Sequence, residues 1–174
     1  MKVFYLTFIF LIFSCLQDKE IFNNLKKAEI PISSAVKINS VHTDSGLVSS
    51  ILNSPKMLNF SNAIFPYYEF PNEIEVILYD KKKNKTKITA DYAISYSNSD
   101  LIDLRGNVVV STHLSDTLTS DQLYYDRGQE WLFTNYNFRY VSLDKDIYGK
   151  GFDSDKSFEK IKFLEVNGFV SIDE

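Results

Sequence analysis

The fold is decided by the stretch that opens with Ile88-Thr89-Ala90-Asp91 and closes with Asn107-Val108-Val109-Val110. Thirty residues further on, the pattern returns as Leu118-Thr119-Ser120-Asp121 and Asn137-Phe138-Arg139-Tyr140. A third, slightly longer copy runs from Tyr148 to Val170. Repeats at an equal offset of this size indicate stacked copies of one hairpin-like unit. The pattern therefore predicts an elongated, all-β body.

Strand periodicity is clearest just before the first repeat. The segment 73–79 places Ile74, Val76 and Leu78 on one face and two glutamates on the other. The lysine-rich segment 81–87 follows and is read as the solvated tip of a hairpin, with contact to lipid phosphate groups as the alternative. Strand then follows strand with short polar breaks, which predicts two facing antiparallel sheets, as in a sandwich or a jelly roll.

Length, composition and charge narrow the class of protein. The chain has 174 residues, which is enough for one domain with a sizeable core. Phe and Tyr supply most of an aromatic content of 15%, and such side chains favour half-buried pleated surfaces. The formal net charge is −4. Because a phosphate-binding surface needs a basic excess, this charge argues against a nucleic-acid partner.

The N-terminus has the pattern of an export signal. Lys2 precedes the apolar run Val3–Phe13, which is shorter than the roughly 20 apolar residues of a membrane-spanning helix. The run ends at Ser14-Cys15, and Leu11-Ile12-Phe13-Ser14-Cys15 resembles the lipobox of bacterial lipoproteins. We therefore expect Cys15 to be acylated and to anchor the protein to a membrane. The alternative is that Cys15 is an incidental residue of a signal or of a poorly formed anchor.

These features divide the chain into three parts. We expect a lipoprotein signal peptide at 1–14, a lipid anchor and linker at 15–33, and a β-jelly roll domain at 34–174. Because Cys15 is the only cysteine, no disulfide can form within the chain. Stability must then come from core packing and from the hydrogen bonds between strands.

Several short motifs along the domain resemble one family in the same order. They are Leu52-Asn53-Ser54-Pro55-Lys56-Met57, Tyr68-Glu69-Phe70-Pro71, Ala90-Asp91-Tyr92-Ala93, Leu104-Arg105-Gly106-Asn107-Val108, the segment Leu118–Asp126, and Gly149-Lys150-Gly151-Phe152. Together they look like an LptC domain, the periplasmic component of the lipopolysaccharide-export machinery, over roughly residues 34–170. The resemblance implies an open, twisted β-jelly roll that accepts lipopolysaccharide from the inner-membrane ABC permease and passes it to an LptA-like bridging protein.

The resemblance also implies a lipid-binding groove between the two sheets. We expect this groove to be lined by in-facing apolar residues, although the same side chains could simply fill a closed core. The candidates are Ile74, Val76, Leu78, Ile88, Ala90, Ile94, Ile102, Leu104, Val108, Val110, Phe133, Phe138 and Tyr140.

Partners are expected at the sheet edges, because an unpaired edge strand exposes N–H and C=O groups that another sheet can continue. In the family, the N-terminal edge meets the permease, and the corresponding candidates are Val36, Ile38 and Leu47. The C-terminal edge meets the bridging protein, and the candidates there are Ile161, Phe163 and Val166.

A catalytic or cofactor-binding site is not expected. His113-Leu114-Ser115-Asp116 contains the residue types of a triad, but neighbours on one strand point to alternating faces. His42 and His113 are the only histidines and have no cysteine nearby, which argues against a zinc site. We predict no enzyme activity, no metal and no cofactor.

Two other functions remain as alternatives. One is a β-sandwich lipoprotein with a structural or assembly role in the cell envelope, and the other is an LptA-like bridging protein. A lipid anchor argues against the second, since a bridge is expected to be soluble. The expected location is the periplasm, lipid-anchored to the inner membrane, with the outer membrane as the alternative.

Overall fold

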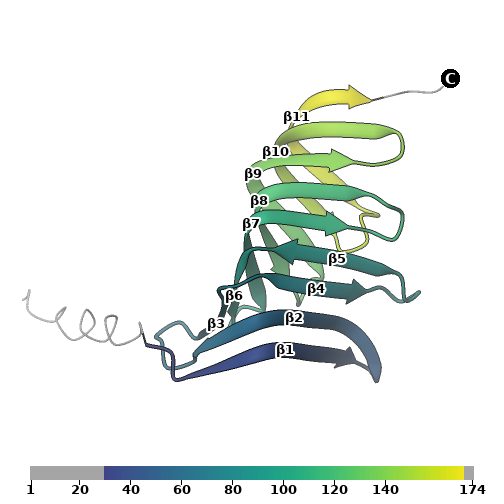
Figure 1. Cartoon of the computed structure of the whole chain (residues 1–174). Coiled ribbons are helices and arrows are strands. Elements are labelled where there is room, and N and C mark those ends of the chain that lie inside the picture. Colours follow the sequence, from purple (N-terminus) through teal and green to yellow (C-terminus); the bar gives the residue numbers. More distant parts are fainter. Residues whose placement is uncertain (1–29, 171–174) are drawn as a thin grey trace, which may run out of the picture.

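Eleven antiparallel strands follow one another along the chain in the computed structural model, which describes residues 30–170 (Figure 1). No helix interrupts them within these residues. The all-β prediction is thus confirmed. The strands are β1 (Ser33–Asp44), β2 (Leu47–Phe60), β3 (Tyr67–Phe70), β4 (Ile74–Tyr79), β5 (Lys85–Ala90), β6 (Tyr92–Tyr96), β7 (Leu101–Ser111), β8 (Thr117–Asp126), β9 (Trp131–Val141), β10 (Lys145–Asp155) and β11 (Ile161–Val170).

The strands form one hydrogen-bonded sheet that is bent into two layers. Layer A contains β4 and β5, and layer B contains β3 and β6. The longer strands β1, β2 and β7–β11 contribute one part to each layer. For example, β7 pairs with β6 through Ile102–Arg105 and with β5 through Val109–Ser111. The expected pair of facing sheets is therefore a single sheet folded over on itself, which is a jelly-roll arrangement.

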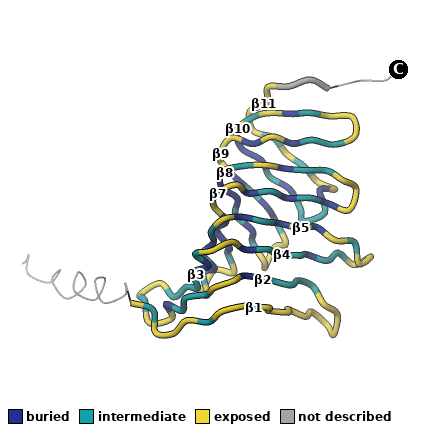
Figure 2. Tube along the Cα trace, in the orientation of Figure 1, coloured by how far each residue is buried: buried dark blue, intermediate teal, exposed yellow. Residues whose placement is uncertain are grey.

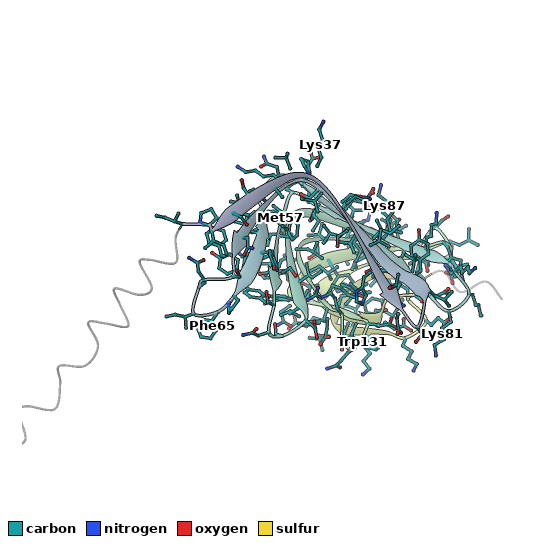
Figure 3. The ribbon with its side chains drawn as sticks, turned by 90° about the horizontal axis from the view of Figure 1, so that it is seen from below. Lys37, Met57, Phe65, Lys81, Lys87 and Trp131 are labelled. Atoms are coloured by element: carbon teal, nitrogen blue, oxygen red, sulfur yellow. The ribbon has the colours of Figure 1, made fainter. Side chains whose placement is uncertain are left out.

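The bends have a local cause in the sequence. In β7, Gly106 and Asn107 have φ values of 73° and 45°, a left-handed conformation that glycine and asparagine tolerate best. Gly151 does the same in β10, with φ of 80°. The pairing register shifts at both positions, as it does at a β-bulge. Figure 3 shows the equivalent bend in β1, with Lys37 at its crest.

The register carries the apolar pattern from strand to strand, because directly opposite residues point to the same face. The three repeats that the sequence indicated correspond to the paired strands β5 and β7, then β8 and β9, then β10 and β11. One in-facing row crosses layer A through Val76, Ile88, Val110, Leu118, Tyr140 and Ile147. Another crosses layer B through Ser95, Ile102, Tyr125, Leu132, Ser154 and Ile161.

Candidate functional site

The space between the two layers is the candidate site. Side chains from layer A, such as Val110 and Tyr140, and from layer B, such as Leu104 and Phe152, belong to one continuous apolar cluster. In the middle of the stack these side chains are almost fully buried, since Val110 and Leu104 are both 0% exposed. The layers therefore touch each other there, and the interior is a packed core along its middle.

Most of the groove residues predicted from sequence lie in this interior. Their alternation with polar neighbours places them all on the inner face of the folded sheet. The residues buried there are Ile74, Val76, Leu78, Ile88, Ala90, Ile102, Leu104, Val108, Val110, Phe138 and Tyr140.

Two predicted groove residues, Ile94 and Phe133, face outward instead, so this part of the prediction is wrong. In the bend between β5 and β6, the single residue Asp91 reverses the alternation, and Ala93 becomes the buried residue while Ile94 lies opposite Asp103. Phe133 lies on the outer face of β9, where its ring stacks on Tyr124 at 5.2 Å between centroids. Alternation follows one face only within an unbroken strand.

Several interior residues were missed by the sequence reasoning. The second repeat carries a readable signal, since leucines recur on each side of the β8 bend. The phenylalanine that follows Gly151 is also placed by the register shift at that glycine. Phe158 gives no signal, because it belongs to a turn. The missed buried apolar residues are Phe70, Ala93, Leu118, Leu123, Tyr125, Leu132, Ile147, Phe152 and Phe158.

An aromatic cluster fills the C-terminal part of the interior. The Phe152 ring lies 5.7 Å from Phe138 and 5.9 Å from Phe163, measured between ring centroids. The centroid of the Phe152 ring also lies 6.4 Å from that of Tyr140 and 5.3 Å from that of Phe158. Offset and tilted rings at these separations attract one another beyond simple burial. This cluster joins layer A, which supplies Phe138 and Tyr140, to layer B.

Both ends of the interior are exposed, unlike its middle. β1 and β11 are the outermost strands within residues 30–170. Figure 2 shows that β1 is exposed along most of its length, and in β11 most of residues 161–167 are exposed as well. At the C-terminal end, Phe163 is partly buried against the core, whereas Val166 is 53% exposed. Val166 lies opposite Gly149 in the register, on the same side as Phe138. The apolar interior therefore reaches solvent at β11.

At the N-terminal edge, only two of the three residues predicted from sequence lie on the free edge strand β1. Val36 and Ile38 lie on β1, whose outer side carries no strand in the described part of the chain. Leu47, however, belongs to β2, which pairs with β1 on one side and with β3 and β4 on the other. Leu47 is therefore exposed at the end of a paired strand and is not part of the free edge, because the first two strands form a hairpin.

The outer face of layer B buries one carboxylate. Asp103 is 1% exposed, and both Nε and Nη2 of Arg105 donate hydrogen bonds to it, at 2.9 and 2.5 Å. Gln122 Nε2 donates to the other carboxylate oxygen at 2.6 Å. The hydrogen bonds to Asp103 raise the pKa of the Arg105 guanidinium. A buried charge is tolerated here because it is paired and fully hydrogen-bonded.

The outer face of layer A carries a polar group at the bend. Lys87 Nζ lies 2.5 Å from Glu75 Oε2, and Asn53 Nδ2 donates to Glu75 Oε1 at 3.1 Å. The hydrogen bond from Lys87, and to a smaller extent that from Asn53, lowers the pKa of the Glu75 carboxyl. A surface hollow of ≈ 750 Å³ is lined here by polar side chains, among them Lys37 and Asp91, as well as by Glu75 and Asn53. Its lining mixes these polar side chains with apolar ones such as Ile38 and Pro55, so it is less uniformly apolar than the interior.

Some expectations concern features outside this site. Cys15 and most of the predicted signal and linker lie outside the described residues. Within residues 30–170, no helix is long and apolar enough to cross a membrane. In the same part of the chain, no three histidine, cysteine, aspartate or glutamate residues are grouped as they would be to hold a metal ion.

Comparison with known proteins is consistent with this geometry. The family described as "Lipopolysaccharide-assembly, LptC-related" matches residues 4–169 of the chain. The match covers every strand from β1 to β10 and nearly all of β11. A comparison with curated proteins found no match.

Proposed function

Because the chain belongs to the LptC family of lipopolysaccharide-assembly proteins, we propose that the acyl chains of lipopolysaccharide travel between its two layers. In this proposal, the protein accepts lipopolysaccharide from the inner-membrane ABC permease and passes it to an LptA-like bridging protein. Membership of the family implies a role in lipopolysaccharide transport, in the periplasm and in association with the inner membrane. What we propose beyond this is the route of the acyl chains through this chain and the two proteins with which it exchanges lipopolysaccharide.

The observation that carries the proposal is the continuity of the apolar interior from one end of the stack to the other. Its middle is closed, with Leu104 and Val110 fully buried, and its C-terminal end is open at Val166. The layers are joined by the bends and by apolar side-chain packing. Acyl chains could therefore replace contacts between the layers with equivalent ones, since each buried methylene contributes about 0.8 kcal/mol.

The proposal is tested by photocrosslinking in cells that make lipopolysaccharide. β9 offers a matched pair, because Phe138 lies in the interior and Phe133 lies on the outer face of the same strand. p-Benzoylphenylalanine keeps the phenylalanine ring, adds a photoreactive benzoyl group at its para position, and can be incorporated at either residue. We expect a lipopolysaccharide adduct from position 138 and none from position 133. If the folded protein gives no adduct at 138, the interior is a closed core, and a structural role in the envelope becomes the better account.

Transfer to the bridging protein is proposed to use the edge of β11. The exposed Val166 lies where a partner sheet would continue the apolar interior. Val166→Lys places a charge at this edge, which disfavours edge-to-edge pairing. We expect this variant to lose capture of an LptA-like protein in a pull-down. Leu143→Lys, in a fully exposed turn, is the control and should retain capture.

Membrane attachment is proposed to depend on acylation of Cys15. Labelled palmitate should be incorporated into the exported chain, and Cys15→Ser should abolish both the labelling and the recovery of the protein in the membrane fraction. Membrane recovery of Cys15→Ser without label would instead identify the N-terminal segment as an uncleaved anchor.

A further inference from the structure

Phe158 occupies an unusual position for a large apolar residue. It lies in the turn between β10 and β11, yet it is only 7% exposed. Its backbone has φ of 60°, a left-handed conformation that is uncommon for a bulky side chain. Residues held in this way persist only where their surroundings impose the conformation, and they are frequent in clamps and switch regions. Packing of the ring is what imposes it here.

The ring of Phe158 bridges the two layers. Its centroid lies 6.0 Å from that of Tyr140 in layer A and 5.3 Å from that of Phe152 in layer B. The ring thus closes the aromatic cluster on the side where the chain turns back. An apolar chain inserted between the layers at this level would take up the contacts that Phe158 now makes.

The backbone of the turn is held by a small set of polar contacts. Asp155 Oδ1 accepts hydrogen bonds from the N–H groups of Glu159 and Lys160, at 2.8 and 3.2 Å. The turn is tied to the neighbouring β8–β9 turn by one residue pair. The N–H of Lys156 donates to the carbonyl oxygen of Glu130 at 3.1 Å, and Lys156 Nζ lies 2.5 Å from Glu130 Oε1. The Glu130 side chain is half exposed, whereas that of Lys156 is 12% exposed. Both contacts lie just beyond Asp155 and Trp131, the last residue pair between β9 and β10, so breaking them leaves that pairing intact.

A cleft lies on the outer side of the same turn. This hollow of ≈ 710 Å³ is bounded by the tips of both layers. Tyr79 and Lys81 line it from the β4–β5 hairpin. Trp131 lines it from the start of β9, and Ser157 and Glu159 line it from the β10–β11 turn. Figure 3 shows Trp131 and Lys81 on the side of the molecule away from the bend at Lys37. Because Ser157 and Glu159 line the cleft while Phe158 packs inward, this turn separates the cleft from the interior.

We propose that the Phe158 turn is a gate through which the acyl chains of an amphiphile pass between the tip cleft and the interior. The inference rests on the proposed function, because it assumes that acyl chains occupy the interior. In the closed state seen here, the ring packs against both Tyr140 and Phe152. When the Lys156–Glu130 contact opens, the turn swings outward, and an acyl chain replaces the ring against the same two side chains.

A disulfide lock tests the gate in the full-length protein. Glu130→Cys combined with Lys156→Cys places two cysteines next to the paired residues Asp155 and Trp131, where the N–H of Lys156 already donates to the carbonyl oxygen of Glu130. Their backbones are therefore close together, as a disulfide requires. The photoreactive residue at position 138 then reports lipopolysaccharide in the interior. We expect the adduct to be lost when the disulfide forms and to return after reduction with dithiothreitol. The two single-cysteine variants are the matched controls and should keep the adduct.

A third substitution separates gating from distortion. Phe158→Gly removes the ring and suits the positive φ, so in the locked protein it should restore the adduct at position 138. An adduct that persists in the locked protein with Phe158 present would overturn the gate and leave the proposed function standing. A folded, locked Phe158→Gly variant without an adduct would also overturn it. Absence of the adduct in the unlocked protein would refute the proposed function, and the gate with it.

Discussion

Gly149 keeps the C-terminal edge strand in place, and replacing it with alanine should loosen β11. An ideal Cβ at this position would overlap the carbonyl oxygen of Glu165 and would lie 2.9 Å from Cε1 of Phe138. Phe138 could turn aside, but the Glu165 oxygen belongs to the backbone of β11. β10 and β11 would have to move apart until the new Cβ lies at least 3.0 Å from the Glu165 carbonyl oxygen.

The expected cost follows from this displacement. Overpacking a well-packed region costs about 1–3 kcal/mol. Because the clash is with backbone, we expect Gly149→Ala to lie at the upper end, at about 3 kcal/mol of unfolding free energy. The damage should be local, since β11 pairs with β10 and Gly149 lies opposite Val166 in their register.

Urea unfolding and amide hydrogen exchange measure the two parts of this prediction. The urea midpoint should fall, and exchange should accelerate in β11 more than in β7 or β8. Gly128→Ala is the matched control, because its Cβ would make only an ordinary contact, 3.4 Å from Asp126 Oδ1. A surface change of this kind should stay within about 0.5 kcal/mol. Equal midpoints for the two variants, with unchanged exchange in β11, would refute the steric reasoning.

Three further predictions concern the interior and the outer face. Phe152→Ala should lower the unfolding free energy by about 3–5 kcal/mol in urea, because it empties the centre of the aromatic cluster, whereas the fully exposed Leu143→Ala should have little effect. Arg105→Ala should destabilise the fold more than Asp103→Asn in the same assay, because it leaves a buried carboxylate without its cation; the reverse order would contradict this reading. The pKa of Glu75 is lowered, chiefly by its lysine partner, so its contribution is present above the carboxyl's unfolded pKa and is lost as pH falls through the lower folded value. Replacing Glu75 with glutamine should flatten the loss of thermal stability between about pH 5 and pH 2.

Local patterns were readable before the structure because their physical cause is local. Alternation of side chains between two faces is a property of each strand, so Ile74, Val76 and Leu78 were placed correctly from their spacing alone. The same rule failed for Ile94, because one residue in the preceding bend reversed the faces. A bend of one residue reverses the alternation and a bend of two preserves it, and the length of the bend is not visible from composition.

Burial of charge was harder to predict than burial of apolar groups. Asp103 looks like an exposed strand residue, and it does lie on the outer face. It is nevertheless buried, because Arg105 and Gln122 cover it with hydrogen bonds. Gln122 becomes a neighbour of Asp103 only through the pairing of β7 with β8. Hydrogen-bond partners of this kind follow from strand pairing and from the position of the bends.

The amino-acid pattern alone predicted that the chain is all β, that a hairpin-like unit repeats along it, and which residues within an unbroken strand share a face. These features arise from interactions over a few residues, chiefly the alternation of side chains between the two faces of a strand. The tertiary structure alone decided that one sheet folds into two layers that touch. It also decided that Phe158 closes the interior from a turn, because both outcomes depend on contacts between residues far apart in the chain.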